Sequence, residues 1–85
     1  MSVVKVAYLA SFQSFTGKES ERIPVRENET FEDLMKRLSA RYGTRFARRL
    51  DEHLAIVFLN GEQIVGNPIL NDHDEILFAV LVGGG

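Results

Sequence analysis

The 85-residue chain has the composition of one small soluble domain, because 45% of its residues are hydrophobic and 26% are charged. It contains no cysteine, which excludes disulfides, thiolate nucleophiles and cysteine-ligated metal or iron–sulfur sites. No apolar stretch reaches the roughly 18–20 residues that cross a bilayer, and the first residues lack the pattern of a signal peptide. We therefore expect a soluble, cytoplasmic protein that does not contact membranes.

The formal net charge of −2 conceals an uneven distribution. All ten Lys and Arg residues lie at or before Arg49, together with six acidic residues. From Leu50 onward there are six acidic residues and no Lys or Arg. The acidic second half favours a basic surface on a partner that binds the C-terminus, although scattered surface charges more often serve only solvation.

The chain begins with two predicted strands. Residues 3–9 are apolar and β-branched enough for a strand that is buried on at least one face. Residues 11–19 are polar with one glycine and predict a turn, from which two phenylalanines fold back onto the core. Residues 22–25 predict a second strand, short or at an edge of the sheet, because Pro24 has no N–H.

Helices are predicted next. Thr30 can cap the first one, with Asp33 at the position of a capping box. The apolar residues of this helix recur at helical spacing and form one stripe that would pack on a sheet: Phe31, Leu34, Met35, Leu38 and Tyr42. Gly43 is expected to end the helix in a left-handed conformation, and residues 44–51 to form a shorter one.

The second half predicts strands. Residues 54–59 are followed by Asn60-Gly61, the strongest short hairpin signal, and residues 62–65 return. A polar turn at 71–74 leads into a last strand from Glu75 to about Val82. The order of two strands, helices and further strands predicts an α+β domain, with the helix on one face of a mixed sheet and the first and last strands paired.

Few residues could carry catalysis or bind a metal. His53 and His73 are the only histidines, and neither belongs to a metal-binding or nucleophile–base motif. The acidic residues between 72 and 75 indicate turn chemistry, because a calcium site needs more oxygen ligands. We expect no metal site and no catalytic activity of the chain alone.

Six cationic residues cluster in the helical region: Lys36, Arg37, Arg41, Arg45, Arg48 and Arg49. Such a cluster could bind RNA or phosphate groups. Its spacing is more typical of the solvated side of an amphipathic helix, and no exposed aromatic residues are interleaved with it. Nucleic-acid binding is therefore the less favoured interpretation.

Three glycines follow the last predicted strand without a linker. Because Gly83, Gly84 and Gly85 carry no Cβ, they could pass through a narrow channel and deliver the Gly85 carboxylate, ionised near neutral pH, into another protein's active site. The alternatives are a frayed end or a remnant of expression. We divide the chain into a domain at 1–82 and a tail at 83–85.

Several segments form one pattern when taken together. They are Val4–Tyr8, Phe15-Thr16-Gly17, Thr30–Leu34, Arg41-Tyr42-Gly43, Leu59–Glu62, residues 68–75 and the end from Glu75 to Gly85. In their order and spacing they resemble the β-grasp sulfur carriers of the ubiquitin-like superfamily, most closely the MoaD-like small subunits of molybdopterin synthase. His73 stands where this family usually has glycine, which implies a positive φ there. Val80-Leu81 replaces two prolines of many members and Gly83 another small residue, which implies a less rigid or more strand-like stem.

The resemblance implies a β-grasp sheet of about four to five strands and a carrier that acts as a substrate of other enzymes. An ATP-using adenylyltransferase of the ubiquitin-activating type would adenylate Gly85, and a sulfurtransferase would supply sulfur for a terminal thiocarboxylate. The tail would then enter the large subunit of molybdopterin synthase, within a heterotetramer, and donate sulfur during molybdenum cofactor biosynthesis. Gly84 and Gly85 would carry the reaction and Gly83 would give clearance. The partner uses the ATP, and the chain itself binds no cofactor.

Other functions fit the same features. The chain could carry sulfur for thiamine, cysteine or tRNA thiolation, or it could be a protein modifier joined through Gly85 to lysines. A third hypothesis is an interaction or nucleic-acid-binding module in which the glycines are incidental.

A docking surface is expected on the sheet face that the helix leaves open. Phe58 and Phe78 occupy central strand positions, and we expect at least one of them on this face, with Leu81 near the tail. The alternative is that both phenylalanines belong to the core.

Overall fold

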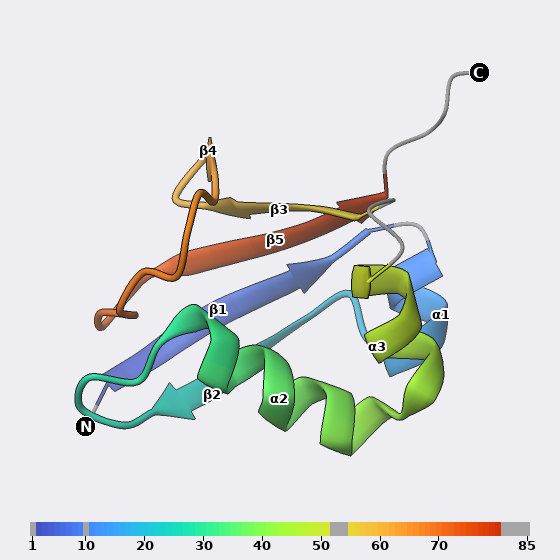
Figure 1. Ribbon diagram of the computed structural model, residues 1–85, viewed down its shortest axis with the longest axis horizontal. Coiled ribbons are helices and arrows are strands. Elements are labelled where there is room, and N and C mark those ends of the chain that lie inside the picture. Colours follow the sequence, from blue (N-terminus) through green and yellow to red (C-terminus); the bar gives the residue numbers. More distant parts are fainter. Residues whose placement is uncertain (1, 10, 52–54, 81–85) are drawn as a thin grey trace.

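The computed structural model describes residues 2–9, 11–51 and 55–80. Its elements are β1 (Ser2–Tyr8), α1 (Ser11–Thr16), β2 (Ser20–Val25), α2 (Phe31–Tyr42), α3 (Thr44–Asp51), β3 (Ala55–Leu59), β4 (Glu62–Gln63) and β5 (Glu75–Val80). The five strands form one sheet in the order β2-β1-β5-β3-β4 (Figure 1). The predicted α+β class with a mixed sheet is confirmed.

The first and last strands lie side by side in the sheet, as predicted. β1 and β5 run parallel, with Lys5 opposite Glu75 and Tyr8 opposite Phe78. The remaining pairs, β1–β2, β3–β5 and β3–β4, are antiparallel. β2 lies at an edge of the sheet. Pro24 is tolerated there, because an edge strand need not donate hydrogen bonds on both sides.

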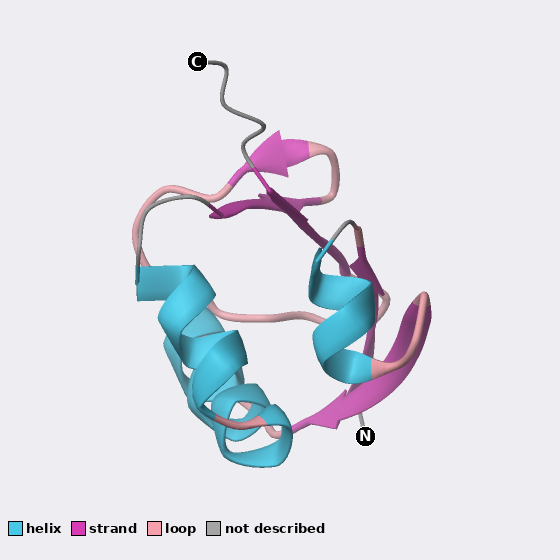
Figure 2. Cartoon of the chain, turned by 90° about the vertical axis from the view of Figure 1, so that its right-hand side faces the viewer, coloured by secondary structure: helices cyan, strands magenta, loops and turns pink. Residues whose placement is uncertain are grey.

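All three helices pack on one face of the sheet, which curves around them (Figure 2). The core between these layers contains four aromatic residues that are fully buried, Tyr8, Phe12, Phe46 and Phe78. The ring of Phe78 lies 5.4 Å from that of Phe12 and 5.6 Å from that of Phe46, within the range of favourable aromatic contacts. The opposite face of the sheet carries no helix of the described residues.

The start of α2 follows the sequence-based expectation, and its end does so in position but not in backbone conformation. The Asp33 N–H donates to Thr30 Oγ1 over 3.2 Å, and the Thr30 N–H donates to Asp33 Oδ2 over 3.1 Å, which completes the capping box. Gly43 ends the helix, and its N–H donates to the Ser39 carbonyl over 2.8 Å. Its φ of 92° is positive, as glycine allows, although its ψ of −170° lies outside the left-handed helical region.

Three segments differ from the prediction. Residues 11–16 form α1 instead of part of a turn, because the buried Phe12 ring anchors this short helix to the core and Thr16 Oγ1 bonds the Phe12 carbonyl over 2.9 Å. The second strand begins at Ser20, two residues before the predicted start. The return strand is limited to Glu62–Gln63, since only two residues pair with β3.

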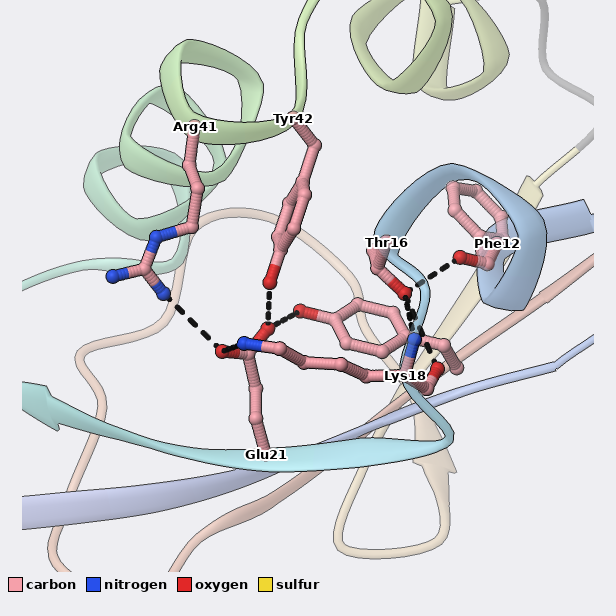
Figure 3. Close-up of polar contacts among 7 residues, drawn as sticks. Phe12, Thr16, Lys18, Glu21, Arg41 and Tyr42 are labelled. Atoms are coloured by element: carbon pink, nitrogen blue, oxygen red, sulfur yellow. Dashed lines mark hydrogen bonds and ion pairs between the residues drawn. The ribbon is translucent and has the colours of Figure 1, made fainter.

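One carboxylate connects β2 to three other parts of the fold. Glu21 accepts hydrogen bonds from the Tyr8 hydroxyl over 2.7 Å and from the Tyr42 hydroxyl. It also lies 3.3 Å from Lys18 Nζ and 3.2 Å from Arg41 Nη1 (Figure 3). Burial acts to raise its pKa, but hydrogen bonds from the two tyrosines and Lys18 prevail, so the pKa of Glu21 lies below its ordinary value. This carboxylate therefore stabilises the fold only while it is ionised.

We predict that Glu21→Gln lowers the free energy of unfolding at pH 7 by on the order of 1–3 kcal/mol, because the charged acceptor for both tyrosines is lost. The folded protein holds the Glu21 carboxylate ionised to lower pH than the unfolded chain does. The stabilisation is therefore complete above the ordinary pKa and disappears as the pH falls through the depressed one. Denaturant unfolding followed from pH 7 to pH 3 should show a smaller loss of stability in the variant than in the wild type.

The matched control for this prediction is Glu19→Gln, which removes an exposed carboxylate from the turn that precedes β2. It should leave both the stability and its pH dependence nearly unchanged. Parallel stability curves for wild type and Glu21→Gln across this pH range would contradict the role assigned to Glu21.

Candidate partner-binding surface

The side chains of β5 divide between the two faces of the sheet. Ile76, Phe78 and Val80 pack in or against the core. Because neighbouring side chains of a strand point to opposite faces, Leu77 and Ala79 lie on the face without helices, which we call the open face. Both are half-buried. The open face of the central strand is therefore apolar.

Neighbouring strands extend this apolar surface. Phe58 of β3 pairs directly with Leu77, and Ile56 pairs with Ala79. On the other side of β5, Ala7 of β1 lies beside Leu77. We define the open-face patch as six residues: Ala7, Leu9, Ile56, Phe58, Leu77 and Ala79. A depression of about 400 Å³ within it is lined by Ala7, Phe58 and Leu77 together with Lys5, Gly61, Glu75 and Ile76.

The structure separates the two phenylalanines that were candidates for partner binding. Phe58 lies on the open face, so at least one of the two is there, as expected. Phe78 is 0% exposed and stacks on Tyr8 with ring centroids 5.6 Å apart. The interpretation of Phe78 as a partner-binding residue is therefore wrong, because its position in β5 turns the ring into the core. The other candidates, Leu81, Gly83, Gly84 and Gly85, lie outside the described residues.

Five of the six patch residues, all except Phe58, were missed by the reasoning from sequence. Leu9 is 44% exposed and follows β1, where its N–H donates to the Phe78 carbonyl over 2.9 Å and continues the parallel ladder. Ala7 lies two residues earlier on the same face, and the other three are Ile56, Leu77 and Ala79. For Ala7 and Leu9 the available signal was Lys5, a charged residue of the same strand that marks the odd-numbered positions as the solvent-facing ones.

The turn before β5 holds this strand in register with β1. The Val3 N–H donates to Asp72 Oδ1 over 2.8 Å, and the His73 N–H donates to the Val3 carbonyl over 2.9 Å. The backbone hydrogen bond from Val3, which outweighs a small opposing effect of desolvation, lowers the pKa of Asp72. His73 has a φ of 68°, which confirms the expected positive value.

Asp74 completes this turn. Its carboxylate accepts the Asn71 N–H over 2.7 Å and the Asn60 side-chain amide over 3.0 Å, so it links the turn to the β3–β4 hairpin. The acidic residues here make turn hydrogen bonds, as predicted. Among the described residues, no group of three or more His, Cys, Asp and Glu side chains could hold a metal ion. His53 lies outside the described residues.

No helix in the described part of the chain is long and apolar enough to span a membrane. The basic side chains of α2 and α3 are partly engaged within the fold. Arg37 pairs with the buried Glu29 carboxylate over 2.8 Å, Arg41 pairs with Glu21, and Arg49 lies over the Phe15 ring at 5.8 Å. These contacts support a structural use for part of the cationic cluster.

Three solved structures share the architecture. A Pyrococcus furiosus protein provisionally named molybdopterin converting factor subunit 1 has a TM-score of 0.83 at 23% identity, covering 96% of this chain and 100% of its own. Small archaeal modifier protein 1 from Methanosarcina acetivorans has a TM-score of 0.77 at 22% identity, covering 100% and 98%. The HVO 2177 protein from Haloferax volcanii has a TM-score of 0.83 at 26% identity, covering 99% and 87%. No curated protein matches the sequence significantly.

The sequence itself matches a family as well as a fold. Residues 6–85 match the ThiS family, and this range includes β5 and the three terminal glycines. Together with the structural similarities, the match confirms the predicted β-grasp fold and the resemblance to ubiquitin-like sulfur carriers. The chain belongs to the ThiS family.

Proposed function

We propose that the chain is a sulfur carrier whose Gly85 carboxylate is adenylated and converted to a thiocarboxylate that donates sulfur in molybdopterin biosynthesis. The observation that carries the proposal is the ThiS-family match through Gly85, five residues after a central strand whose open face is apolar and carries no helix of the described residues. Similarity to the Pyrococcus furiosus protein favours the molybdopterin pathway over other sulfur-transfer pathways.

The chemistry requires two displacements at the chain terminus. A carboxylate oxygen of Gly85 attacks the α-phosphorus of ATP and pyrophosphate leaves, which converts a poor electrophile into an acyl-adenylate. A sulfide-level sulfur nucleophile from a sulfurtransferase then attacks the acyl carbon. AMP departs with the former carboxylate oxygen, and the product is the thiocarboxylate. In this proposal the chain supplies the reacting carboxylate, while the adenylyltransferase and the large subunit of molybdopterin synthase supply the active sites.

The open-face patch provides the means to position the terminus. β5 is bonded to β1 on one side and to β3 on the other, so its direction is fixed by the sheet. A partner that covers Phe58 and Leu77 would therefore hold the exit of β5 in a defined place. Burial of one such side chain contributes about 1.5–3 kcal/mol, enough for selective docking. We place such a carrier in the cytoplasm, because its adenylation requires ATP.

The first test is intact-mass measurement after incubation with a cognate adenylyltransferase, ATP and a sulfur donor. The mass should rise by the difference between a sulfur and an oxygen atom, and fragmentation should place the change on Gly85. Oxidation of Met1 or Met35 gives a similar mass, so fragments containing each methionine must remain unmodified. A chain lacking Gly84 and Gly85 is the control and should gain no mass. Failure of the wild type to change at Gly85 would disprove the proposal.

A second test separates docking from folding. Phe58→Ala should weaken binding to the adenylyltransferase about tenfold or more, with little change in stability, because Phe58 lies on the open face. Phe78→Ala should instead lower stability by about 3–5 kcal/mol, because it leaves a cavity among Tyr8, Phe12 and Phe46. Titration calorimetry and denaturant unfolding measure the two effects. Unchanged binding by a folded Phe58→Ala variant would contradict the docking surface.

Leu81→Ala should weaken binding to the adenylyltransferase as well, because the sequence places this apolar residue near the tail.

The alternative is a protein modifier joined through Gly85 to lysines of other proteins, which is favoured by the similarity to small archaeal modifier protein 1. It requires the same acyl-adenylate, followed by attack of a lysine amine in place of sulfur. We expect no isopeptide-linked conjugates when the tagged chain is purified from cells under denaturing conditions with deconjugating enzymes inhibited. Recovery of a Gly85–lysine linkage by mass spectrometry would establish the modifier function.

A further inference from the structure

Two cations lie directly opposite each other on the open face, at the end of the sheet away from the exit of β5. Lys5 of β1 pairs in register with Arg22 of β2, and both side chains are exposed. The Lys5 N–H donates to the Asp74 carbonyl on the other side of β1. Lys5 and Arg22 therefore form a non-hydrogen-bonded pair of the antiparallel ladder, the arrangement that brings opposing side chains closest.

No ion pair with a described residue neutralises either member of this pair. Neither Lys5 nor Arg22 makes an ion pair or a side-chain hydrogen bond with any described residue, whereas Arg37 and Arg41 each have a carboxylate partner. Like charges placed directly opposite destabilise a sheet. Glu75, beside Lys5 on β5, is the nearest acidic residue in the ladder, and Asp72 is committed to the Val3 N–H. Beside Arg22, by contrast, the ladder places no acidic residue on the open face, because its neighbours there are Ser20, Pro24 and Lys5.

The pair is continuous with the open-face patch. Lys5 lines the apolar depression that contains Phe58 and Leu77. It also lines a second depression, of about 770 Å³, with Arg22, Pro24 and His73. The patch and the two cations therefore form one continuous surface, and a molecule that covers the patch can also contact Lys5 and Arg22.

We propose that Lys5 and Arg22 bind a carboxylate that the partner protein presents beside its own apolar docking surface. This inference rests on the proposed function, since the partner in question is the enzyme that docks on the open-face patch. A carboxylate placed between the two side chains would relieve their repulsion and accept hydrogen bonds from both. A protein carboxylate fits better than a nucleic acid, because one carboxylate can lie between the two cations, whereas a longer run of phosphates would also lie over the acidic Glu75 and Asp72.

The location of the pair allows this contact to orient β5 relative to the partner protein. Lys5 lies opposite Glu75, five residues before the end of β5 at Val80, which corresponds to about 17 Å along a strand. The partner is then held at two points, by the apolar contact at the middle of β5 and by the charge contact at its beginning. Two separated contacts fix the direction of β5 relative to the partner, whereas an apolar contact alone would allow rotation about it.

The test is the ATP–pyrophosphate exchange catalysed by the cognate adenylyltransferase with the carrier as varied substrate. In the double variant Lys5→Gln/Arg22→Gln, KM should rise about tenfold or more while kcat stays within about twofold, because docking is lost but the tail is intact. The wild-type KM should rise with salt between about 0.05 and 0.5 M, and the variant's KM should respond much less. The swap Lys5→Arg/Arg22→Lys should retain a low KM.

Two controls make the result specific. Arg45→Gln/Arg48→Gln removes the same charge from exposed positions of α3 and should leave KM unchanged. The thermal midpoint of Lys5→Gln/Arg22→Gln at low salt should equal or exceed that of the wild type, since a repulsion is removed. A reduced midpoint would contradict the proposed repulsion.

The outcomes distinguish this inference from the function on which it rests. If the wild type is adenylated and the double variant has the same KM, or if the α3 control loses as much, the carboxylate contact is overturned and the carrier function stands. If the wild type is not adenylated, both the carboxylate contact and the proposed carrier function are disproved. Binding of a single-stranded RNA oligonucleotide that is lost only in Lys5→Gln/Arg22→Gln would assign the pair to nucleic acid and overturn the protein contact.

Discussion

The parallel pairing of β1 with β5 is the constraint on which the rest of the molecule depends. It places the last strand in the middle of the sheet, between β1 and β3. The turn at Asp72 and His73 secures it through backbone contacts with Val3 at the beginning of β1. A strand at an edge could slip in register or be displaced, whereas β5 is held on both sides. The direction of β5 up to Val80 is therefore fixed by the sheet even though the domain is small.

A second consequence of this pairing is that the two faces of the sheet differ: one packs against the helices, and the other carries no helix of the described residues. The aromatic core and Glu21 stabilise the side covered by the helices, where Tyr8 contributes both a buried ring and a hydroxyl that donates to Glu21. Burial, followed by the contact with this carboxylate, raises the pKa of Tyr8 and keeps it a donor throughout the physiological range. The buried core lies on that side, so Leu9 and Phe58 on the open face are not part of it, and Leu9 is exposed.

The sequence predicts those parts of the fold whose signals are local. Thr30 and Asp33 form the capping box, Asn60-Gly61 forms the hairpin, and the helical spacing of Leu34 and Leu38 locates the core face of α2. These features depend on residues only a few positions apart. The α1 helix is not predicted because its six residues are polar apart from two phenylalanines, and Phe12 stabilises it only through contacts with distant residues.

The faces of β5 could not be assigned from its own residues. Its apolar run continues on both faces, so alternation alone does not show which set is buried. The register with β1 decides this, because the parallel ladder sets Phe78 opposite the buried Tyr8. Residues three apart in a regular strand point to opposite faces, so Phe78 and Leu81 could not both have belonged to one open surface. Likewise, the Lys5–Arg22 pair appears only when β1 and β2 are aligned.

Val80 stands where many members of the family have proline, and unlike proline it has an N–H that can take part in strand pairing. Val80 pairs with Ala55, so β5 retains its ladder with β3 up to this residue, consistent with the more strand-like stem expected from the sequence. Only five residues of the chain follow Val80. Even fully extended, five residues reach no more than about 18 Å. If Gly85 is the reacting residue, the partner's active site must open within this distance of the end of β5. Such a short reach leaves little freedom for loose docking, so the proposed function requires contacts elsewhere on the domain, for which we propose the open face, to orient it before the terminus reacts.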